Sequence, residues 1–325
     1  MVPHPPQLRL SGPRAGDKTR PTMTPLSRRA ALQKLTLGAV AAGAAVALPS
    51  RLGAAEPTPA AAGRVGRVRQ SVCRWCFAKI SLPDLCVAAK KFGLQSIELL
   101  QPSEFATVRE HGLSCAMVSN PILDFGAIKV GPIAKSWNRR EYHDTLVTGY
   151  ENHLRLTAEA GYPNLICFSG NRDGMSDEEG LENCAVGLRR IMPLAEKLGV
   201  TVCMELLNSR VNHKDYMCDR TAWGVELCRR VGSERFKLLY DIYHMQIMEG
   251  DVIATIRANH QYIGHYHTAG VPGRANIDDT QELYYPAIIR AIMDTGYRGF
   301  LGQEFIPKVP DALGALEQGV RICDV

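Results

Sequence analysis

Residues 199–206 read GVTVCMEL, a glycine followed by apolar and β-branched residues, with the carboxylate of Glu205 near the end of the run. A run of this kind is typical of a strand that is buried on both faces of a parallel sheet. Similar runs recur along the chain and are separated by amphipathic stretches, an alternation that indicates βα units. The predicted strands are residues 70–76, 96–100, 114–120, 164–169, 200–206, 236–241, 262–267 and 299–305.

The stretches between these runs carry helix start and stop signals. Ser176 stands three residues before Glu179, the spacing of a capping box, and predicts a helix through residues 180–198 that Gly199 ends. Residues 121–140 are the one long irregular stretch, which predicts a lid or an excursion over the mouth of a barrel. The sequence thus predicts an α/β fold, a (β/α)8 TIM barrel forming a single domain over residues 63–325. The other predicted helices, with start signals at Ser81, Asp219 and Pro286, are residues 84–92, 221–231 and 287–295.

The N-terminal 62 residues have a different character. Ser27-Arg28-Arg29 opens a charged region, an apolar run of 14 residues follows at 35–48, and small residues stand at 53–55. This order predicts a twin-arginine-type signal peptide and flexible leader over residues 1–62, and export to the periplasm or another extracytoplasmic space. An uncleaved anchor, or a tail with a chance arginine pair in a cytoplasmic protein, is the alternative. The start at Met1 or Met23 and the cleavage of the leader stay open.

Charge and length exclude several classes of protein. The formal net charge is +5, but residues 1–62 hold eight Lys/Arg against Asp17 and Glu56, so the remaining body carries −1. A basic surface for nucleic acid is therefore not expected. The apolar run of the leader is too short to span roughly 30 Å of hydrocarbon, and no stable membrane span is predicted.

Ten cysteines are spread along the chain rather than framed as a small disulfide scaffold. Cys73-x-x-Cys76 has the spacing of a redox pair or of half a zinc site. The sequence has no second Cys-x-x-Cys pair that would complete a four-cysteine zinc site. We therefore favour the interpretation that both residues simply end a strand near a pocket.

Ionisable residues stand at the ends of the last four predicted strands. They are Glu205, Asp241, His267 and Glu304, spaced by about one βα unit each. The carboxyl ends of barrel strands face the active site, so these side chains are expected to converge. Burying a carboxylate alone is costly, and four such groups together indicate one shared divalent metal ion, with Mn²⁺, Mg²⁺ or Co²⁺ favoured over Zn²⁺. His265 points to the same side as His267, one layer deeper.

Motifs around these strand ends resemble hydroxypyruvate isomerase and the wider xylose isomerase-like barrel superfamily, which includes ketose 3-epimerases. The resemblance covers residues 70–308 and rests on four segments, Met204-Glu205-Leu206-Leu207-Asn208, Tyr240-Asp241-Ile242-Tyr243-His244-Met245-Gln246, His265-Tyr266-His267-Thr268-Ala269-Gly270-Val271-Pro272-Gly273-Arg274 and Gly302-Gln303-Glu304-Phe305.

The resemblance implies that Glu205, Asp241, His267 and Glu304 hold the metal and that Glu205 and Glu304 are also the catalytic proton-transfer pair. It further implies that His244 and Arg274 bind substrate oxygens. Hydroxypyruvate isomerases tend to carry Gln where this chain has His267, while ketose epimerases carry His, so both activities stay open.

Other polar and aromatic residues at strand ends are candidate substrate contacts. They are Trp75, Glu98, Asn120 and Asn171. We expect Trp75 to wall the pocket and the other three to meet substrate hydroxyls.

The predicted function is metal-dependent isomerisation of an α-hydroxy aldehyde or ketone, either a small keto acid such as hydroxypyruvate or a small sugar. Glutamates move the proton, and the metal holds the enediolate that forms. A ketose 3-epimerase on the same site is the first alternative, and a non-catalytic sugar-binding barrel is the alternative of another class. An endonuclease IV-type protein is disfavoured because it needs a His-rich trinuclear zinc site and a basic face. The oligomeric state, monomer or homo-oligomer, stays open.

Overall fold

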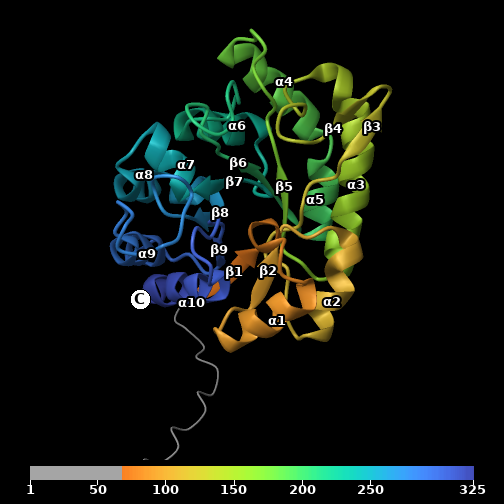
Figure 1. Ribbon diagram of the computed structural model, residues 1–325. Coiled ribbons are helices and arrows are strands. Elements are labelled where there is room, and N and C mark those ends of the chain that lie inside the picture. The colour runs from red at the N-terminus through yellow and green to blue at the C-terminus, as the bar shows by residue number, and fades with distance from the viewer. Residues whose placement is uncertain (1–67) are drawn as a thin grey trace, which may run out of the picture. The chain divides into compact units, whose positions relative to one another are not determined.

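A computed structural model describes residues 68–325 (Figure 1). The predicted leader, residues 1–62, lies outside the described residues. Within the described part of the chain, no helix has both the length and the apolar character that a bilayer crossing requires.

Seven parallel strands form the main sheet, in the order β2-β1-β9-β8-β7-β6-β5. Each matches a predicted strand, and neighbouring strands pair in parallel throughout. Helices separate consecutive strands along the chain and lie outside the sheet (Figure 1). The strands are β1 (Arg69–Cys73), β2 (Ser96–Glu98), β5 (Asn164–Cys167), β6 (Thr201–Glu205), β7 (Phe236–Asp241), β8 (Ile263–Thr268) and β9 (Phe300–Gln303).

The segment predicted as the third strand, residues 114–120, closes the barrel without forming a regular strand. It makes isolated parallel bridges to both edges of the sheet, at Ser96↔Ser114, Leu100↔Val118 and Val118↔Leu165. Side chains replace the missing ladder bonds at Ala116, whose N–H donates to Ser96 Oγ (2.7 Å) and whose carbonyl accepts from Asn164 Nδ2 (2.8 Å). The eighth strand position of the barrel is therefore occupied, but in its middle two side chains, from Ser96 and Asn164, make the hydrogen bonds that a regular strand would receive from backbone groups.

Three of the four predicted helix starts are confirmed, at Ser81, Ser176 and Pro286. Ser81 accepts from the Asp84 N–H and Ser176 from the Glu179 N–H, as expected for N-caps. The main helices are α1 (Leu82–Lys91), α2 (Phe105–Glu110), α3 (His143–Glu159), α4 (Asp177–Arg189), α5 (Met192–Leu198), α6 (Thr221–Val231), α7 (Ile242–Met248), α8 (Val252–Asn259), α9 (Tyr285–Asp294) and α10 (Ala312–Cys323).

Two helix predictions were wrong. The single helix predicted through residues 180–198 is divided into α4 and α5, because Pro193 lacks the N–H that would bond the Arg189 carbonyl and its ring crowds that turn. Asp219 does not cap α6. Its carboxylate is engaged by Arg172 and Ser209, and the Thr221 N–H at the start of α6 donates to Glu249 instead.

Part of the long irregular stretch, residues 121–140, is a small antiparallel hairpin. It consists of β3 (Leu123–Phe125) and β4 (Ile128–Val130). Residues on both sides of the hairpin, Ile122 and Pro132 to Ala134, line a large cavity at the carboxyl ends of the strands. The stretch is therefore a wall of the barrel mouth.

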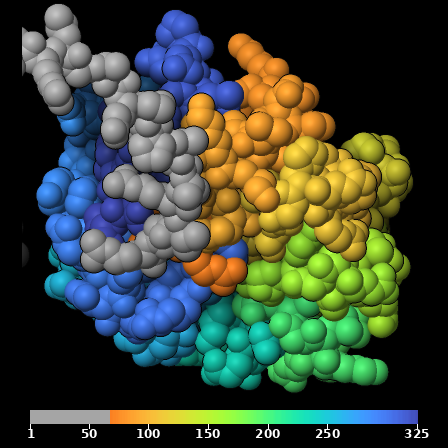
Figure 2. Space-filling view, turned by 90° about the horizontal axis from the view of Figure 1, so that it is seen from below, coloured from red at the N-terminus to blue at the C-terminus, as the bar shows by residue number. Residues whose placement is uncertain are grey.

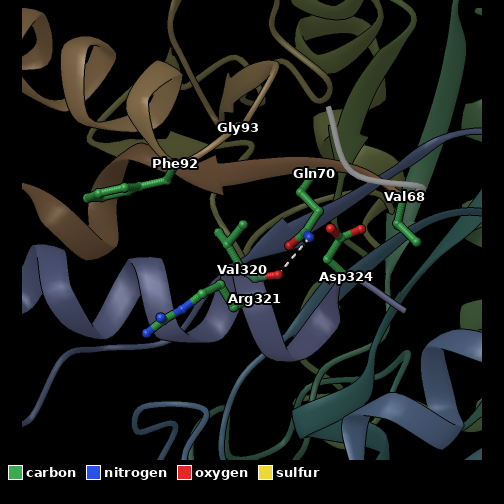
Figure 3. A pocket seen from close by; sticks show the side chains of 7 residues that line it. All are labelled: Val68, Gln70, Phe92, Gly93, Val320, Arg321 and Asp324. Carbon is green, nitrogen blue, oxygen red and sulfur yellow. Dashed lines mark hydrogen bonds between the residues drawn. The ribbon is translucent and has the colours of Figure 1, made fainter. Parts of the chain in front are cut away.

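The opposite end of the barrel is where the first and last elements of the described chain meet. The residues that follow α1 and residues near the end of α10 line one small cavity there. Figure 2 shows the molecule from below, with orange surface from the first described elements and blue surface from the last ones on the same face. Figure 3 shows the small cavity, about 70 Å³, with Gln70 Nε2 donating to the Val320 carbonyl at 3.0 Å. This end is mainly a closure of the fold.

The irregular segment at residues 114–120 leads to a prediction about stability. Ser96→Ala and Asn164→Ala each leave a buried backbone group of Ala116 without its partner, so each is expected to lower the free energy of unfolding by about 1–3 kcal/mol. Urea unfolding measures this. Asn152→Ala, at an exposed position of α3, is the control and is expected to change stability by no more than about 0.5 kcal/mol. Equal stability of all three variants would contradict the account of the closure.

Candidate active site

Four ionisable side chains meet at the carboxyl ends of consecutive strands. Glu205 ends β6, Asp241 ends β7, His267 is the last residue but one of β8, and Glu304 directly follows β9. Each offers one ligand-type atom, and these four atoms all lie within 4.8 Å of one another. All four residues are almost fully buried. We refer to Glu205, Asp241, His267 and Glu304 as the acidic cluster.

Arg274, on the loop after β8, balances part of this negative charge. Its Nη2 donates to Glu304 Oε2 and, at 3.3 Å, to Asp241 Oδ2. Its guanidinium carbon lies 5.0 Å from the ring centroid of Trp75 and 5.7 Å from that of Tyr243. Burial disfavours the charged arginine, but the carboxylates beside it outweigh this and raise its pKa. Arg274 is therefore a fixed positive charge at the cluster.

The two glutamates of the acidic cluster experience opposite electrostatic effects. Burial alone would raise the pKa of Glu304, but Arg274 and His267 outweigh it and hold that pKa well below its usual range. The pKa of Glu205 is raised by burial and by the charge of Glu304. Two carboxyl groups with divergent proton affinities in one site are the arrangement that acid–base chemistry uses.

The cluster suits a divalent cation. Glu205 Oε1 and His267 Nδ1 are buried, lie 3.6 Å apart and have no hydrogen-bond partner. His267 Nδ1 is also 2.7 Å from Glu304 Oε2, again without hydrogen-bond geometry. Unpartnered buried polar atoms are rare because they are costly, and a shared cation would satisfy them. Three carboxylates and one imidazole form a donor set that fits one divalent metal ion.

His244 lies directly behind the cluster, on the first turn of α7. Its backbone N–H donates to Asp241 Oδ1 at 3.0 Å, so that the Asp241 carboxylate caps α7, and its ring Nε2 is 3.6 Å from Asp241 Oδ2. Burial and the charge of Arg274 hold the pKa of His244 well below its usual range, so the ring is neutral. Its Nδ1 accepts from the Asn208 N–H at 3.1 Å, which leaves the proton on Nε2.

No role is predicted for Asn208 from the sequence, although it stands in the same strand-end motif as Glu205. Its side-chain amide also contacts His244 Nδ1, at 2.6 Å. Asn208 therefore selects the tautomer in which His244 offers an N–H near Asp241. The only signal in the sequence is its position, three residues beyond a proposed ligand.

A cavity of about 650 Å³ opens above the acidic cluster. One end is polar and includes Glu205, Glu304 and Arg274. His213, for which the sequence predicts no role either, also lines the cavity and packs against His244 with ring centroids 5.3 Å apart. The remaining wall is largely apolar and is formed by Leu99, Ile122, Pro132, Ile133, Ala134, Ile166, Phe168 and Leu207.

The other predicted substrate contacts lie at different depths. Trp75 lines the cavity, and its Nε1 donates to Glu304 Oε1 at 2.8 Å. Asn120 also lines the cavity, but its amide nitrogen is tied to the Gly131 carbonyl at 2.8 Å. Asn171 is not among the lining residues, and its backbone pairs with Tyr216.

Glu98 is not among the lining residues of the cavity either. It ends β2, is fully buried, and its Oε1 lies 2.7 Å from His267 Nε2 and 2.9 Å from His265 Nε2. The structure therefore places this carboxylate beneath the acidic cluster. The expectation that Glu98 and Asn171 meet substrate hydroxyls does not agree with these positions.

The state of the cysteines fits the prediction that Cys73 and Cys76 simply end a strand near a pocket. All ten are free thiols, and nine are buried. Burial raises the pKa of both Cys73 and Cys76 well above the ordinary value, which keeps them in the unreactive thiol form.

Gly302 makes room for the contact between Glu98 and His267. It is the cross-strand neighbour of His267, and a Cβ there would lie 2.3 Å from Glu98 Oε1 and 2.7 Å from His267 Cδ2. We therefore expect Gly302→Ala to lower the free energy of unfolding by about 1–3 kcal/mol through overpacking. Thermal unfolding measures this.

Gly319→Ala is the control for that substitution. This helical position has its nearest neighbours at 3.2 and 3.3 Å, and alanine favours the helix, so a smaller change is expected. An unchanged melting temperature for Gly302→Ala would mean that the contact between Glu98 and His267 tolerates a side chain at position 302.

The fold and the site together define a (β/α)8-barrel protein whose ionisable groups converge at the carboxyl ends of its strands. A family model described as a xylose isomerase-like TIM barrel matches residues 87–322. The chain belongs to this family, as the motifs at the strand ends predicted.

Curated relatives are isomerases and epimerases. The 2-oxo-tetronate isomerase of Cupriavidus necator is 30% identical over 242 residues, which cover 71% of this chain and 89% of the relative. The D-psicose 3-epimerase of Ruminiclostridium cellulolyticum is 29% identical over 244 residues, covering 73% and 78%. The hydroxypyruvate isomerase of Escherichia coli is 25% identical over 236 residues, covering 70% and 88%. The chain is accordingly an enzyme of the isomerase or epimerase type.

Among solved structures, one described as an AP endonuclease of family 2 from Brucella melitensis has a TM-score of 0.66 and 23% identity, covering 78% of this chain and 97% of that one. At this identity the likeness shows the TIM-barrel fold alone.

Proposed function

We propose that this protein isomerises an α-hydroxy aldehyde or ketone by moving a proton between neighbouring carbons with Glu205 and Glu304, in the presence of one divalent metal ion. The observation that carries the proposal is the placement of both carboxylates in the acidic cluster and on the wall of one cavity. The proposed substrate is a small keto acid or sugar, in line with the substrates in the names of the curated relatives.

Glu205 and Glu304 have different roles because they lie on different sides of the acidic cluster. Glu205 and Glu304 come from β6 and the end of β9, on either side of the strands that carry Asp241 and His267. A substrate bound between the glutamates turns its reacting C–H toward one carboxylate, which takes the proton, while the other glutamate, in its protonated form, supplies a proton to the neighbouring carbonyl carbon. The hydroxyl proton passes to the former carbonyl oxygen, and the two glutamates regain their starting protonation by exchange with solvent. The single N–H donor of Trp75 holds the Glu304 carboxylate in place for this step.

Negative charge that develops on the substrate oxygens meets donors that are already ordered. Arg274 is held by Glu304 and Asp241 and lines the cavity, so its N–H groups are the donors that face the substrate. His244 is fully buried and is not among the lining residues, so its Nε2, 3.6 Å from Asp241 Oδ2, acts on the site through Asp241 and does not touch the substrate. Preorganised donors of this kind stabilise a developing oxyanion without reorganisation. When bound, the divalent ion contributes Lewis-acid polarisation of the substrate oxygens. Glu205, Asp241, His267 and Glu304 are its proposed ligands, with Mn²⁺, Mg²⁺ or Co²⁺ favoured.

Ketose 3-epimerisation is the second candidate function, and the imidazole of His267 in the cluster favours it. Both reactions begin with removal of a proton from carbon. They differ in where the proton returns, to the neighbouring carbon in the isomerase and to the opposite face of the same carbon in the epimerase. The two functions are therefore separated by product analysis.

A solvent-exchange assay tests the proposal. Hydroxypyruvate, ketopentoses, ketohexoses and inositol-type ketones are incubated in D₂O with added Mn²⁺, Mg²⁺ or Co²⁺, and deuterium at carbon is followed by NMR. Glu205→Gln and Glu304→Gln are each expected to lower the exchange rate by at least 10²–10⁴-fold, the usual contribution of a general acid or base.

Glu178→Gln is the matched control, because this carboxylate is 75% exposed and pairs with Arg230 on the outside of the barrel. It is expected to exchange at the wild-type rate. Metal content measured beside each assay separates loss of the ion from loss of the proton-transfer group. Full activity of either cluster variant would disprove the two-carboxylate mechanism. No exchange on any substrate by the metal-loaded protein would remove the proposed activity.

We also propose that the protein acts outside the cytoplasm, on the strength of the order of charged, apolar and small residues between Ser27 and Ala55. The double substitution Arg28→Lys and Arg29→Lys keeps the charge but removes the arginine pair. In a host with a twin-arginine system, this variant is expected to accumulate as cytoplasmic precursor while the wild type is exported. Cell fractionation and N-terminal sequencing measure this. Equal export of both forms would show that the pair is not the signal.

A further inference from the structure

A second polar layer lies beneath the acidic cluster, and the proposed mechanism does not use it. It consists of Glu98, His265 and Cys73, which come from β2, β8 and β1 and lie against His267 of the cluster. All three residues are fully buried. Glu98 Oε1 lies 2.7 Å from His267 Nε2, 2.9 Å from His265 Nε2 and 3.6 Å from Cys73 Sγ. One carboxylate oxygen thus gathers three side chains.

We propose that Glu98 is the positioning residue of the metal site, fixing the ring of His267 so that Nδ1 faces the acidic cluster. This inference rests on the proposed function, since it takes His267 to be a metal ligand. The carboxylate reaches only the far nitrogen of the ring and acts through His267.

The geometry leaves His267 one role for each nitrogen. At 2.7 Å, Nε2 donates its proton to Glu98 Oε1. Nδ1 is on the opposite side of the ring, buried without a hydrogen-bond partner, 3.6 Å from Glu205 Oε1 and 2.7 Å from Glu304 Oε2. A neutral imidazole with its proton on Nε2 presents a lone pair at Nδ1, which is the form that binds a metal.

The surroundings of Glu98 allow it to position His267 but keep it away from the substrate. It is fully buried and absent from the lining of the cavity, so substrate does not touch it. His265 donates to the same oxygen from below, which orients the carboxylate. Gly302 is on β9, which lies between β1 and β8 in the sheet, and it has no side chain that would occupy the space of Glu98 Oε1.

A purely structural role for the layer is the competing interpretation. A carboxylate between two histidines would also stabilise the interior of the barrel. The two interpretations differ in what they predict for metal affinity. A structural residue changes the free energy of unfolding, whereas a positioning residue changes the dissociation constant of the ion even when the protein is folded.

Isothermal titration of the full chain, stripped of metal, with Mn²⁺ alone and Co²⁺ alone tests the inference. Glu98→Ala is expected to weaken metal binding by about 10–100-fold, the usual effect of losing the partner of a metal-bound histidine. Glu98→Gln keeps an acceptor oxygen without the charge and is expected to give a smaller loss. Circular dichroism establishes that each variant is folded, and the glutamine variant covers the case in which the alanine variant is not.

Asp219→Asn is the matched control. This carboxylate is also buried, but it pairs with Arg172 and Ser209. It is expected to lower stability without changing the metal dissociation constant. If Asp219→Asn and Glu98→Gln weaken metal binding equally, the effect is one of general destabilisation and the inference is wrong.

A double-mutant cycle with His267→Gln identifies the route of the effect. If Glu98 acts through His267, adding Glu98→Gln to His267→Gln changes the dissociation constant by less than about twofold, whereas independent effects would add in free energy. Additive losses would overturn the inference. So would two ions per wild-type chain with Glu98→Gln retaining only one, because Glu98 would then be a ligand itself.

Failure of the inference is distinguishable from failure of the proposed function. Wild type that binds one ion, with Glu98 variants that bind it equally well, overturns the inference and leaves the proposed function intact. Wild type that binds no divalent ion contradicts the metal site of the proposed function.

Discussion

The rest of the site depends on the electrostatic requirement of burying three carboxylates and an imidazole within one small volume. Such a group is stable only if positive charge reaches it, because an unpaired buried charge is strongly disfavoured. Arg274 supplies a fixed charge from the loop after β8, and the donor set accommodates one divalent cation. The parallel barrel makes this possible by bringing the carboxyl ends of β6, β7, β8 and β9 to one rim.

The site is built in layers along the axis of the barrel. The polar layer of Glu98 and His265 lies deepest, the acidic cluster lies above it, and the cavity with its largely apolar wall lies above the cluster. Each layer restrains the next, since the Glu98 carboxylate contacts His267 and Trp75 donates to Glu304. Reactive groups are thus confined to the floor of the cavity. The hairpin of β3 and β4 and its flanks add an enclosing wall.

The family and the fold do not by themselves choose between isomerase and epimerase. Both kinds of enzyme are among the curated relatives, and the same proton-transfer groups serve both reactions. The choice depends on which substrate atoms lie next to Glu205 and Glu304, and therefore on the cavity wall. Function is carried by the site rather than by the barrel.

The sequence by itself determined all eight strand segments of the barrel, seven of which form regular strands, and the candidate ligands at their ends, because strand periodicity, glycine stops and the spacing of βα units are local signals. Only the tertiary structure decided that Ser96 and Asn164 hold the eighth strand position, that Asp219 pairs with Arg172 instead of capping α6, and that Glu98 turns inward to His267. Glu98 lies within the predicted strand 96–100 and Asn120 ends the predicted strand 114–120, and both were expected to meet substrate. Only the structure places Asn120 on the cavity wall and Glu98 beneath the acidic cluster. The distinction arises from contacts between residues up to 169 positions apart, which exist only once the barrel has closed.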